Sequence, residues 1–182
     1  MKDANMRRAR NLVAAFALCS IATSATADTF TLTSSTIAEG QALDALQVFE
    51  GFGCTGGNAA PDLAWSGAPE GTKSFAVTVY DPDAPTGSGW WHWFAFNIPA
   101  DVTTLKAGGA IPEGAIELKN DYGLVGFGGA CPPPGEVHRY QFTVYALGTV
   151  LEIDGNVSNA LAGYMVKANS LASATITAVY TR

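Results

Sequence analysis

Alternating apolar and polar positions, which are typical of half-buried β-strands, recur along most of this chain. The most regular segment is SFAVTVY at 74–80, where one phenylalanine and two valines share a face. Neither face of this segment is strongly polar, which predicts a central strand that is covered on both sides. Pro82 has no backbone N–H and cannot continue a ladder, so we expect the strand to end at Asp81.

A second clear strand follows the TGSG turn, at 90–97. Regular alternation would place Trp91 and Trp93 on one face of this strand, and Trp90 and His92 on the other. Further strands are predicted at 28–35, 45–49, 63–66, 115–119, 138–147 and 175–180.

One stretch has the periodicity of a helix, at 158–172, and Ser158 is a suitable N-cap for it. Apolar side chains recur there at intervals of three and four residues, as on one face of a helix, at Leu161, Met165, Ala168 and Leu171. The segments 101–114 and 120–135 are rich in glycine and proline and are expected to be loops. The predicted fold class is therefore mainly β, with one C-terminal helix.

The first 27 residues have the layout of a cleavable secretory signal. Four basic residues precede an apolar stretch of about ten residues at 12–21, and small residues then lead to a predicted cleavage after Ala27. A membrane anchor is the alternative, but spanning a bilayer takes about 20 apolar residues. A lipoprotein would use Cys19, although the leucine before it fits that signal poorly. We therefore predict a leader at 1–27 and one mature domain at 28–182, which is periplasmic or secreted.

The charge balance excludes several classes of partner. Without the leader, six lysines and arginines remain against fifteen aspartates and glutamates, a net charge of −9. Nucleic acids and anionic membrane surfaces are bound through clustered basic residues, and no basic run remains. A mature domain of 155 residues can also bury a core without the help of a metal or another cofactor.

Two cysteines, Cys54 and Cys131, remain in the mature chain. An oxidising compartment favours their pairing, so we predict a disulfide bond between them. Closing so long a loop would stabilise the fold by roughly 4 kcal/mol in the chain-entropy model. Two free, buried thiols are the alternative.

Acids and imidazoles gather near aromatic residues at the ends of the predicted strands. Asp81 and Asp83 flank a single proline, and His92 and His138 are the two histidines of the chain. The aspartates could converge on one site, or the DPDAP segment could simply form a turn. A metal site from these four residues would match no compact ligand spacing. A GxSxG nucleophile elbow and a P-loop are also absent, so binding of a small polar ligand is the least demanding interpretation.

Three motifs follow one another along the mature chain: DPDAP, WWHW and GGACPPPGEVHRY. Together they resemble the phosphatidylethanolamine-binding protein (PEBP) family, and in particular its bacterial Raf-kinase-inhibitor-like branch, the exported YbhB/YbcL-like proteins. The resemblance covers essentially the whole mature chain. It implies a PEBP-like fold, in which a large central β-sheet packs with a smaller sheet, and an anion-binding pocket at one end of the large sheet. Carried over by motif, the ligand-binding residues would be Asp81, Asp83, Trp90, His92, Gly129, Pro132, His138 and Tyr140.

The leading interpretation is an exported protein that binds a small anionic or zwitterionic ligand, such as phosphate, a phosphoethanolamine-like headgroup or another phosphorylated group, for which catalysis is not needed. Imidazole N–H groups, the Tyr140 hydroxyl and loop amides could donate to phosphate oxygens, while Asp81 and Asp83 would repel a dianion. We therefore expect a preference for a monoanion or a zwitterion. Two alternatives stay open. One is an inhibitor of a protease or kinase that acts through its outer surface and has a vestigial pocket. The other is a slow phosphoester hydrolase with His92 or His138 as general base.

Overall fold

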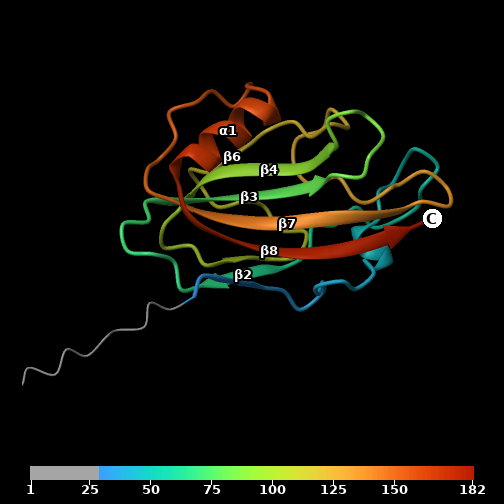
Figure 1. Cartoon of the computed structure of the whole chain (residues 1–182), viewed down its shortest axis with the longest axis horizontal. Helices are drawn as coiled ribbons and strands as arrows, with labels where there is room; N and C mark the ends of the chain where they lie inside the picture. The colour runs from blue at the N-terminus through green and yellow to red at the C-terminus, as the bar shows by residue number, and fades with distance from the viewer. Residues whose placement is uncertain (1–28) are drawn as a thin grey trace, which may run out of the picture.

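In the computed structural model, which describes residues 29–182, the chain forms two antiparallel β-sheets and one α-helix (Figure 1). The larger sheet has the strand order β6-β4-β3-β7-β8 and consists of β3 (Ser74–Asp81), β4 (Trp90–Pro99), β6 (Ile116–Glu117), β7 (Val137–Leu147) and β8 (Ser170–Thr181). The smaller sheet is ordered β1-β2-β5 and consists of β1 (Thr31–Thr33), β2 (Leu63–Ser66) and β5 (Thr104–Leu105). The predicted combination of a large and a small sheet is confirmed. The predicted leader and its cleavage site lie outside the described residues.

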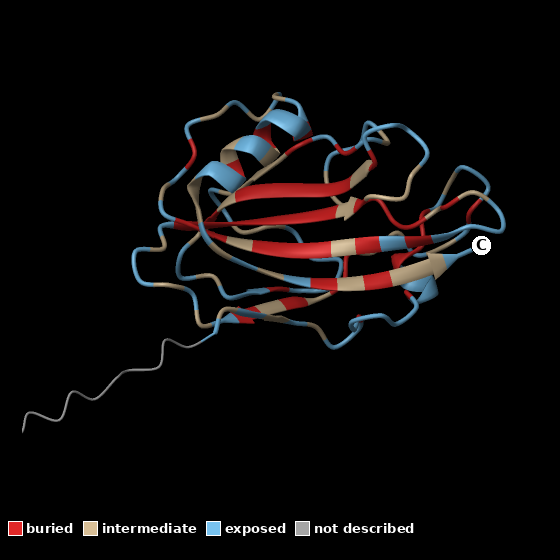
Figure 2. Ribbon diagram, in the orientation of Figure 1, coloured by how far each residue is buried: buried red, intermediate tan, exposed pale blue. Residues whose placement is uncertain are grey.

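The larger sheet separates two hydrophobic clusters. On one face, apolar side chains of β3 and β7 pack against Leu63 and Trp65 of the smaller sheet. On the other face, Ala76 and Phe94 lie in a cluster with helix α1 (Asn159–Asn169). Figure 2 shows that β3 and β4 are buried along most of their length. The prediction of a central strand covered on both sides is therefore confirmed for β3.

Three predicted short strands differ in the structure, and the one predicted at 115–119 is reduced to the two residues of β6. The one predicted at 28–35 is reduced to the three residues of β1. Residues 45–49 form no strand, because Ala45–Gln47 is a 3-10 helix, η1, capped by Asp44. The Asp44 carboxylate accepts a hydrogen bond from the N–H of Leu46 at 3.0 Å, which favours the helical turn. Over so few residues, an apolar pattern alone does not distinguish a strand from such a turn.

Strand β4 contains a β-bulge at His92, which changes the side-chain alternation predicted for this strand. Val79 pairs with Trp93 and Tyr80 pairs with Trp91, so His92 is the extra residue opposite β3. Trp93 consequently packs in the cluster that faces the smaller sheet. Trp91 lies on the helix-covered side, with its ring centroid 4.6 Å from that of Tyr80. The prediction that Trp91 and Trp93 share a face is therefore wrong.

Helix α1 begins where the sequence predicts it. Ser158 is its N-cap, and the Ser158 hydroxyl accepts a hydrogen bond from the N–H of Leu161 at 3.2 Å. The helix ends at Asn169 rather than at 172, because Ser170 is extended and begins β8, where it pairs with Leu147 of β7. Within residues 29–182, no helix is long and apolar enough to cross a membrane.

The buried face of α1 also differs from the prediction. The side chains that face the sheet belong to Ala162 and Val166, whereas Leu161 and Leu171 are about half exposed. A Cβ atom added at Gly163 would contact the Trp91 ring at 3.5 Å, so the helix lies close against the sheet at small residues. The apolar side chains of the predicted stripe are partly or mostly exposed: Leu161, Met165, Ala168 and Leu171.

Candidate functional site

A cavity of about 230 Å³ opens at one end of the larger sheet, where β3 ends and where β4 and β7 begin. Because neighbouring strands are antiparallel, the end of β3 lies beside the starts of both of its neighbours. Six of the eight predicted ligand-binding residues line this cavity: Asp81, Trp90, His92, Pro132, His138 and Tyr140. Asp83 and Gly129 do not line it.

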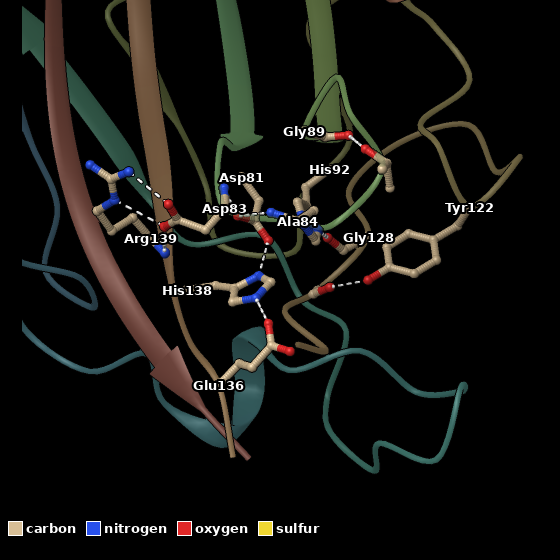
Figure 3. A network of polar contacts seen from close by, with 12 residues as sticks. Asp81, Asp83, Ala84, Gly89, His92, Tyr122, Gly128, Glu136, His138 and Arg139 are labelled. Atoms are coloured by element: carbon tan, nitrogen blue, oxygen red, sulfur yellow. Dashed lines mark hydrogen bonds and ion pairs between the residues drawn. The ribbon is translucent and has the colours of Figure 1, made fainter. Parts of the chain in front are cut away.

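The buried carboxylate of Asp81 both forms a turn and contacts a histidine. Its Oδ1 accepts hydrogen bonds from the backbone N–H groups of Asp83 at 2.8 Å and Ala84 at 3.1 Å. Its Oδ2 lies 2.6 Å from Nδ1 of His138 (Figure 3). The two interpretations of the DPDAP segment, a turn and a site, therefore both hold for this residue.

Asp83 turns away from the cavity and pairs with Arg139. The Arg139 guanidinium donates to Oδ2 of Asp83 at 2.9 Å and to Oδ1 at 2.7 Å, and the backbone N–H of Arg139 also donates to Oδ2. The Arg139 side chain holds the pKa of Asp83 at about 2. The expectation that Asp81 and Asp83 converge on one site is therefore wrong. Pro82 ends the strand between them, so strand alternation does not govern where Asp83 points.

His138 lies between two carboxylates. Its Nδ1 faces Asp81, and its Nε2 lies 2.9 Å from Oε2 of Glu136 (Figure 3). Burial by itself would lower the pKa of His138, but the hydrogen bonds to Glu136 and Asp81 outweigh burial and raise the pKa. His138 is therefore the histidine of the cavity that holds a second proton more readily than a free imidazole does.

His92 has the opposite character. Its Nδ1 donates a hydrogen bond to the carbonyl oxygen of Gly128 at 2.7 Å. Burial lowers the pKa of His92, and the contact with Gly128 offsets this effect only in part. His92 is therefore neutral at pH 7, and because Nδ1 carries the proton, Nε2 carries the lone pair. This nitrogen can accept a hydrogen bond from a ligand.

Two buried donors of the cavity lining have no partner among the described residues: the hydroxyl of Tyr140 and the indole Nε1 of Trp90. Burial raises the pKa of Tyr140, with a further contribution from the negative charge of Asp81, so the phenol stays protonated. Leaving a buried polar group unpaired costs about 1–3 kcal/mol. A ligand that offers acceptor oxygens at this position would recover that free energy.

Gly129 supports the cavity from outside. Its N–H donates to Oδ1 of Asn58 at 2.7 Å, and its carbonyl accepts from the Tyr122 hydroxyl at 3.0 Å. The N–H of Gly128 donates to the carbonyl of His92, and that of Ala130 to the carbonyl of Gln47. The expectation that the amides of this loop are free to donate to an anion is therefore wrong for these three residues.

One wall of the cavity is fixed by the Cys54–Cys131 disulfide, which confirms the predicted pairing at an S–S distance of 2.09 Å. Cys131 itself lines the cavity, and the bond connects it to the loop that carries Phe52, a second lining residue. The Phe52 ring lies 5.4 Å from that of Tyr122, which also lies 5.1 Å from Trp90, measured between centroids. The aromatic rings of Phe52, Trp90 and Tyr122 thus form part of the cavity lining.

Comparison with known proteins gives the family. A model of the phosphatidylethanolamine-binding protein family matches residues 33–181. The chain belongs to this family. Its PEBP relatives include two proteins of Escherichia coli K12. The UPF0098 protein YbcL is 55% identical over 94% of this chain and 98% of YbcL, and the UPF0098 protein YbhB is 48% identical over 82% of this chain and 98% of YbhB.

The PEBP fold is also found by structural comparison. The crystal structure of E. coli YbcL, described as a new member of the mammalian PEBP family, superposes with a TM-score of 0.81. The identity is 57%, and the match covers 84% of this chain and 98% of the YbcL chain. The predicted family and its bacterial branch are therefore confirmed.

Among the residues of this PEBP protein's site that the sequence did not predict are Glu136, Tyr122 and Phe52. Glu136 could have been found, because it stands two positions before His138 and strand alternation places such residues on one side. Tyr122 and Phe52 lie in irregular, glycine-rich segments, where no periodicity shows which way a side chain points. The aromatic character of these two residues was the available signal for a role in binding, but it did not indicate where in the fold their side chains would lie.

Proposed function

We propose that this PEBP-family protein is an exported binding protein whose cavity holds a small ligand with a phosphate group, such as phosphate or a phosphoethanolamine-like headgroup. The observation that carries the proposal is the pair of buried, unpartnered donors on Tyr140 and Trp90, which line the same cavity as His138, whose pKa is raised by its carboxylate partners. Acceptor oxygens with a negative charge complement this set, and hydrogen bonds to charged groups contribute about 1.5–3 kcal/mol each.

The charge of the ligand is limited by the carboxylates that remain near the cavity. Asp81 lines it and Glu136 contacts His138, so the two acids and one imidazolium leave this group with a net negative charge. A phosphate monoanion that retains a P–O–H group would meet less repulsion than a dianion, and it could donate to Nε2 of neutral His92. A zwitterion would gain from the same carboxylates. We therefore propose that the cavity prefers a monoanionic or zwitterionic ligand. The carboxylates that set this preference are Asp81 and Glu136, because Asp83 pairs with Arg139.

Binding without turnover is part of the proposal. The aliphatic hydroxyl in the cavity lining, that of Thr86, donates to the carbonyl of Gly89. Both nitrogens of His138 are engaged by carboxylates, which leaves it no lone pair with which to act as a general base. His92 is then the histidine of the cavity whose lone pair a hydrolase would have to use. Export is supported by the leader-like composition of residues 1–27 and by the Cys54–Cys131 bond, since disulfides persist in oxidising compartments.

The test is calorimetric titration of the mature domain with inorganic phosphate and with phosphoethanolamine at pH 6.5. Wild type is expected to bind, and Tyr140→Phe should weaken binding about tenfold or more, because one charge-assisted hydrogen bond is lost. Tyr164→Phe is the matched control, since Tyr164 is 69% exposed on α1 and far from the cavity lining. Absence of binding by wild type, or equal affinities for the wild type and Tyr140→Phe, would refute the proposal.

A further inference from the structure

With both neighbouring carboxyl groups ionised, the contacts of His138 fit a doubly protonated ring. A neutral imidazole has a single N–H donor, so it can satisfy one carboxylate and must turn a lone pair toward the other. In the structure Nδ1 lies 2.6 Å from Asp81 and Nε2 lies 2.9 Å from Glu136. Both contacts are hydrogen bonds when the ring carries two protons. The geometry therefore fits an imidazolium that donates to two carboxylates.

The two carboxylates hold the ring in different ways. The side chain of Asp81 is 4% exposed and is anchored by two backbone N–H groups as well as by His138. The Glu136 side chain is 52% exposed, and His138 is its hydrogen-bond partner among the described residues. The backbone of Glu136 is held by a turn, in which its N–H donates to the carbonyl of Pro133 at 3.2 Å. The turn therefore holds Glu136 next to His138, and His138 is the one hydrogen-bond partner of the Glu136 carboxylate among the described residues.

We propose that Glu136 is a positioning residue of the cavity, which keeps His138 doubly protonated, so that the positive charge of the ring is held beside the place of an anionic ligand. The ligand part of this inference rests on the proposed function. Asp81 alone would orient the ring through Nδ1, but a neutral His138 with Nδ1 protonated would satisfy Asp81 equally well. The second carboxylate is what makes the second proton favourable.

Other charged and titratable groups near the ring do not replace Glu136. Asp83 is neutralised by its pairing with Arg139. From β8, Tyr180 is the register partner of His138, and from β7 Tyr140 lies on the same face; both are phenols. The titratable groups that share the cavity with His138 are Asp81, His92, Tyr122 and Tyr140. Glu136 contacts its Nε2, Tyr180 is its register partner, and Asp83 and Arg139 form a separate pair.

Glu136→Gln separates the charge of this residue from its hydrogen bond, because the Gln amide oxygen can still accept from Nε2. The experiment follows the imidazole resonances of ligand-free protein by NMR as a function of pH. His92 and His138 are the two histidines of the chain, so the two titrations can be assigned with one His138 variant. Glu70→Gln is the matched control, since Glu70 is exposed in the turn before β3, at the other end of that strand from Asp81.

We expect the pKa of His138 to fall by about one unit in Glu136→Gln, the lower end of the effect of a nearby opposite charge, and to stay unchanged in Glu70→Gln. The same proteins are titrated with glycerophosphoethanolamine, whose charges are constant between pH 6 and pH 8. Wild type should bind it with similar affinity at both pH values. Glu136→Gln should bind at least about threefold more weakly at pH 8 than at pH 6, because part of the imidazolium is lost.

The outcomes distinguish this inference from the proposed function. An unchanged His138 titration in Glu136→Gln overturns the inference, whether or not the ligand binds. A shifted titration together with similar affinities at pH 6 and pH 8 overturns the ligand part of it. A shifted titration in a protein that binds no phosphate compound overturns the proposed function, while the charge-setting contact of Glu136 stands.

Discussion

Replacing Asp81 would separate the two roles of its carboxylate. Oδ1 holds the turn after β3 by accepting from the N–H groups of Asp83 and Ala84, and Oδ2 balances the charge of His138. Asparagine at this position keeps an acceptor for the turn and removes the charge. Alanine removes both the acceptor and the charge. Comparison of the two variants therefore measures the turn separately from the ion pair.

The expected magnitudes follow from the contacts of Asp81. Two turn hydrogen bonds contribute about 1 kcal/mol each to the free energy of unfolding. Breaking a buried ion pair costs about 3–5 kcal/mol when the remaining charge is left alone, but His138 keeps Glu136 as a partner, so we take about 2 kcal/mol. We therefore expect the free energy of unfolding to fall by about 2 kcal/mol in Asp81→Asn and by about 4 kcal/mol in Asp81→Ala.

The assay is urea unfolding at pH 7, followed by the fluorescence of the four tryptophans. Asp101→Ala is the control, because Asp101 is exposed in the loop after β4 and its loss should change the free energy of unfolding by less than about 0.5 kcal/mol. Equal losses in the asparagine and alanine variants would refute the role of Oδ1 in the turn. Losses within the range of the control in both variants would refute the reasoning for both oxygens.

Two further predictions concern the surroundings of the cavity. The pKa of Asp83, about 2, lies below its ordinary value of 3.8, so its contribution to stability is complete above about pH 4 and is lost as the pH falls toward 2. In urea titrations, Asp83→Asn should therefore lose less stability than the wild type between pH 4 and pH 2. The same loss in both proteins would contradict a stabilising contribution from ionised Asp83. The double variant Cys54→Ser, Cys131→Ser removes a cross-link between residues 77 positions apart, and it should lower the free energy of unfolding by about 4 kcal/mol. A loss below about 1 kcal/mol in chemical unfolding would show that this cross-link does not stabilise the fold through loop closure.

The parts of the fold that the sequence predicts well are those with a long and regular pattern. β3 and β7 each alternate over seven or more residues, and their bounds differ from the predicted ones by a single residue. β3 ends, and β7 begins, beside turn-forming residues. The polar side chains there could therefore be assigned to one region from the sequence. Asp81 and His138 meet there because β3 and β7 are antiparallel neighbours.

The errors arise where pairing between distant residues decides the local structure. The bulge at His92 depends on how β4 pairs with β3, and nothing in WWHW itself shows which residue is the extra one. The orientation of Asp83 depends on Arg139, which is 56 positions away. In helix α1, close approach to the sheet favours small residues, so Ala162 and Val166 are buried in preference to the larger leucines.

The separation in sequence of the cavity residues has a consequence for how occupancy can be measured. Asp81 and His138 are 57 positions apart, and they meet after β3 has paired with β7. Partly folded chains therefore lack the site, and a ligand binds the native state alone. Under that condition, a ligand at 100 times its Kd adds about 2.7 kcal/mol to stability. A thermal-shift screen of phosphate compounds, run on the intact domain, would thus rank candidate ligands directly by affinity.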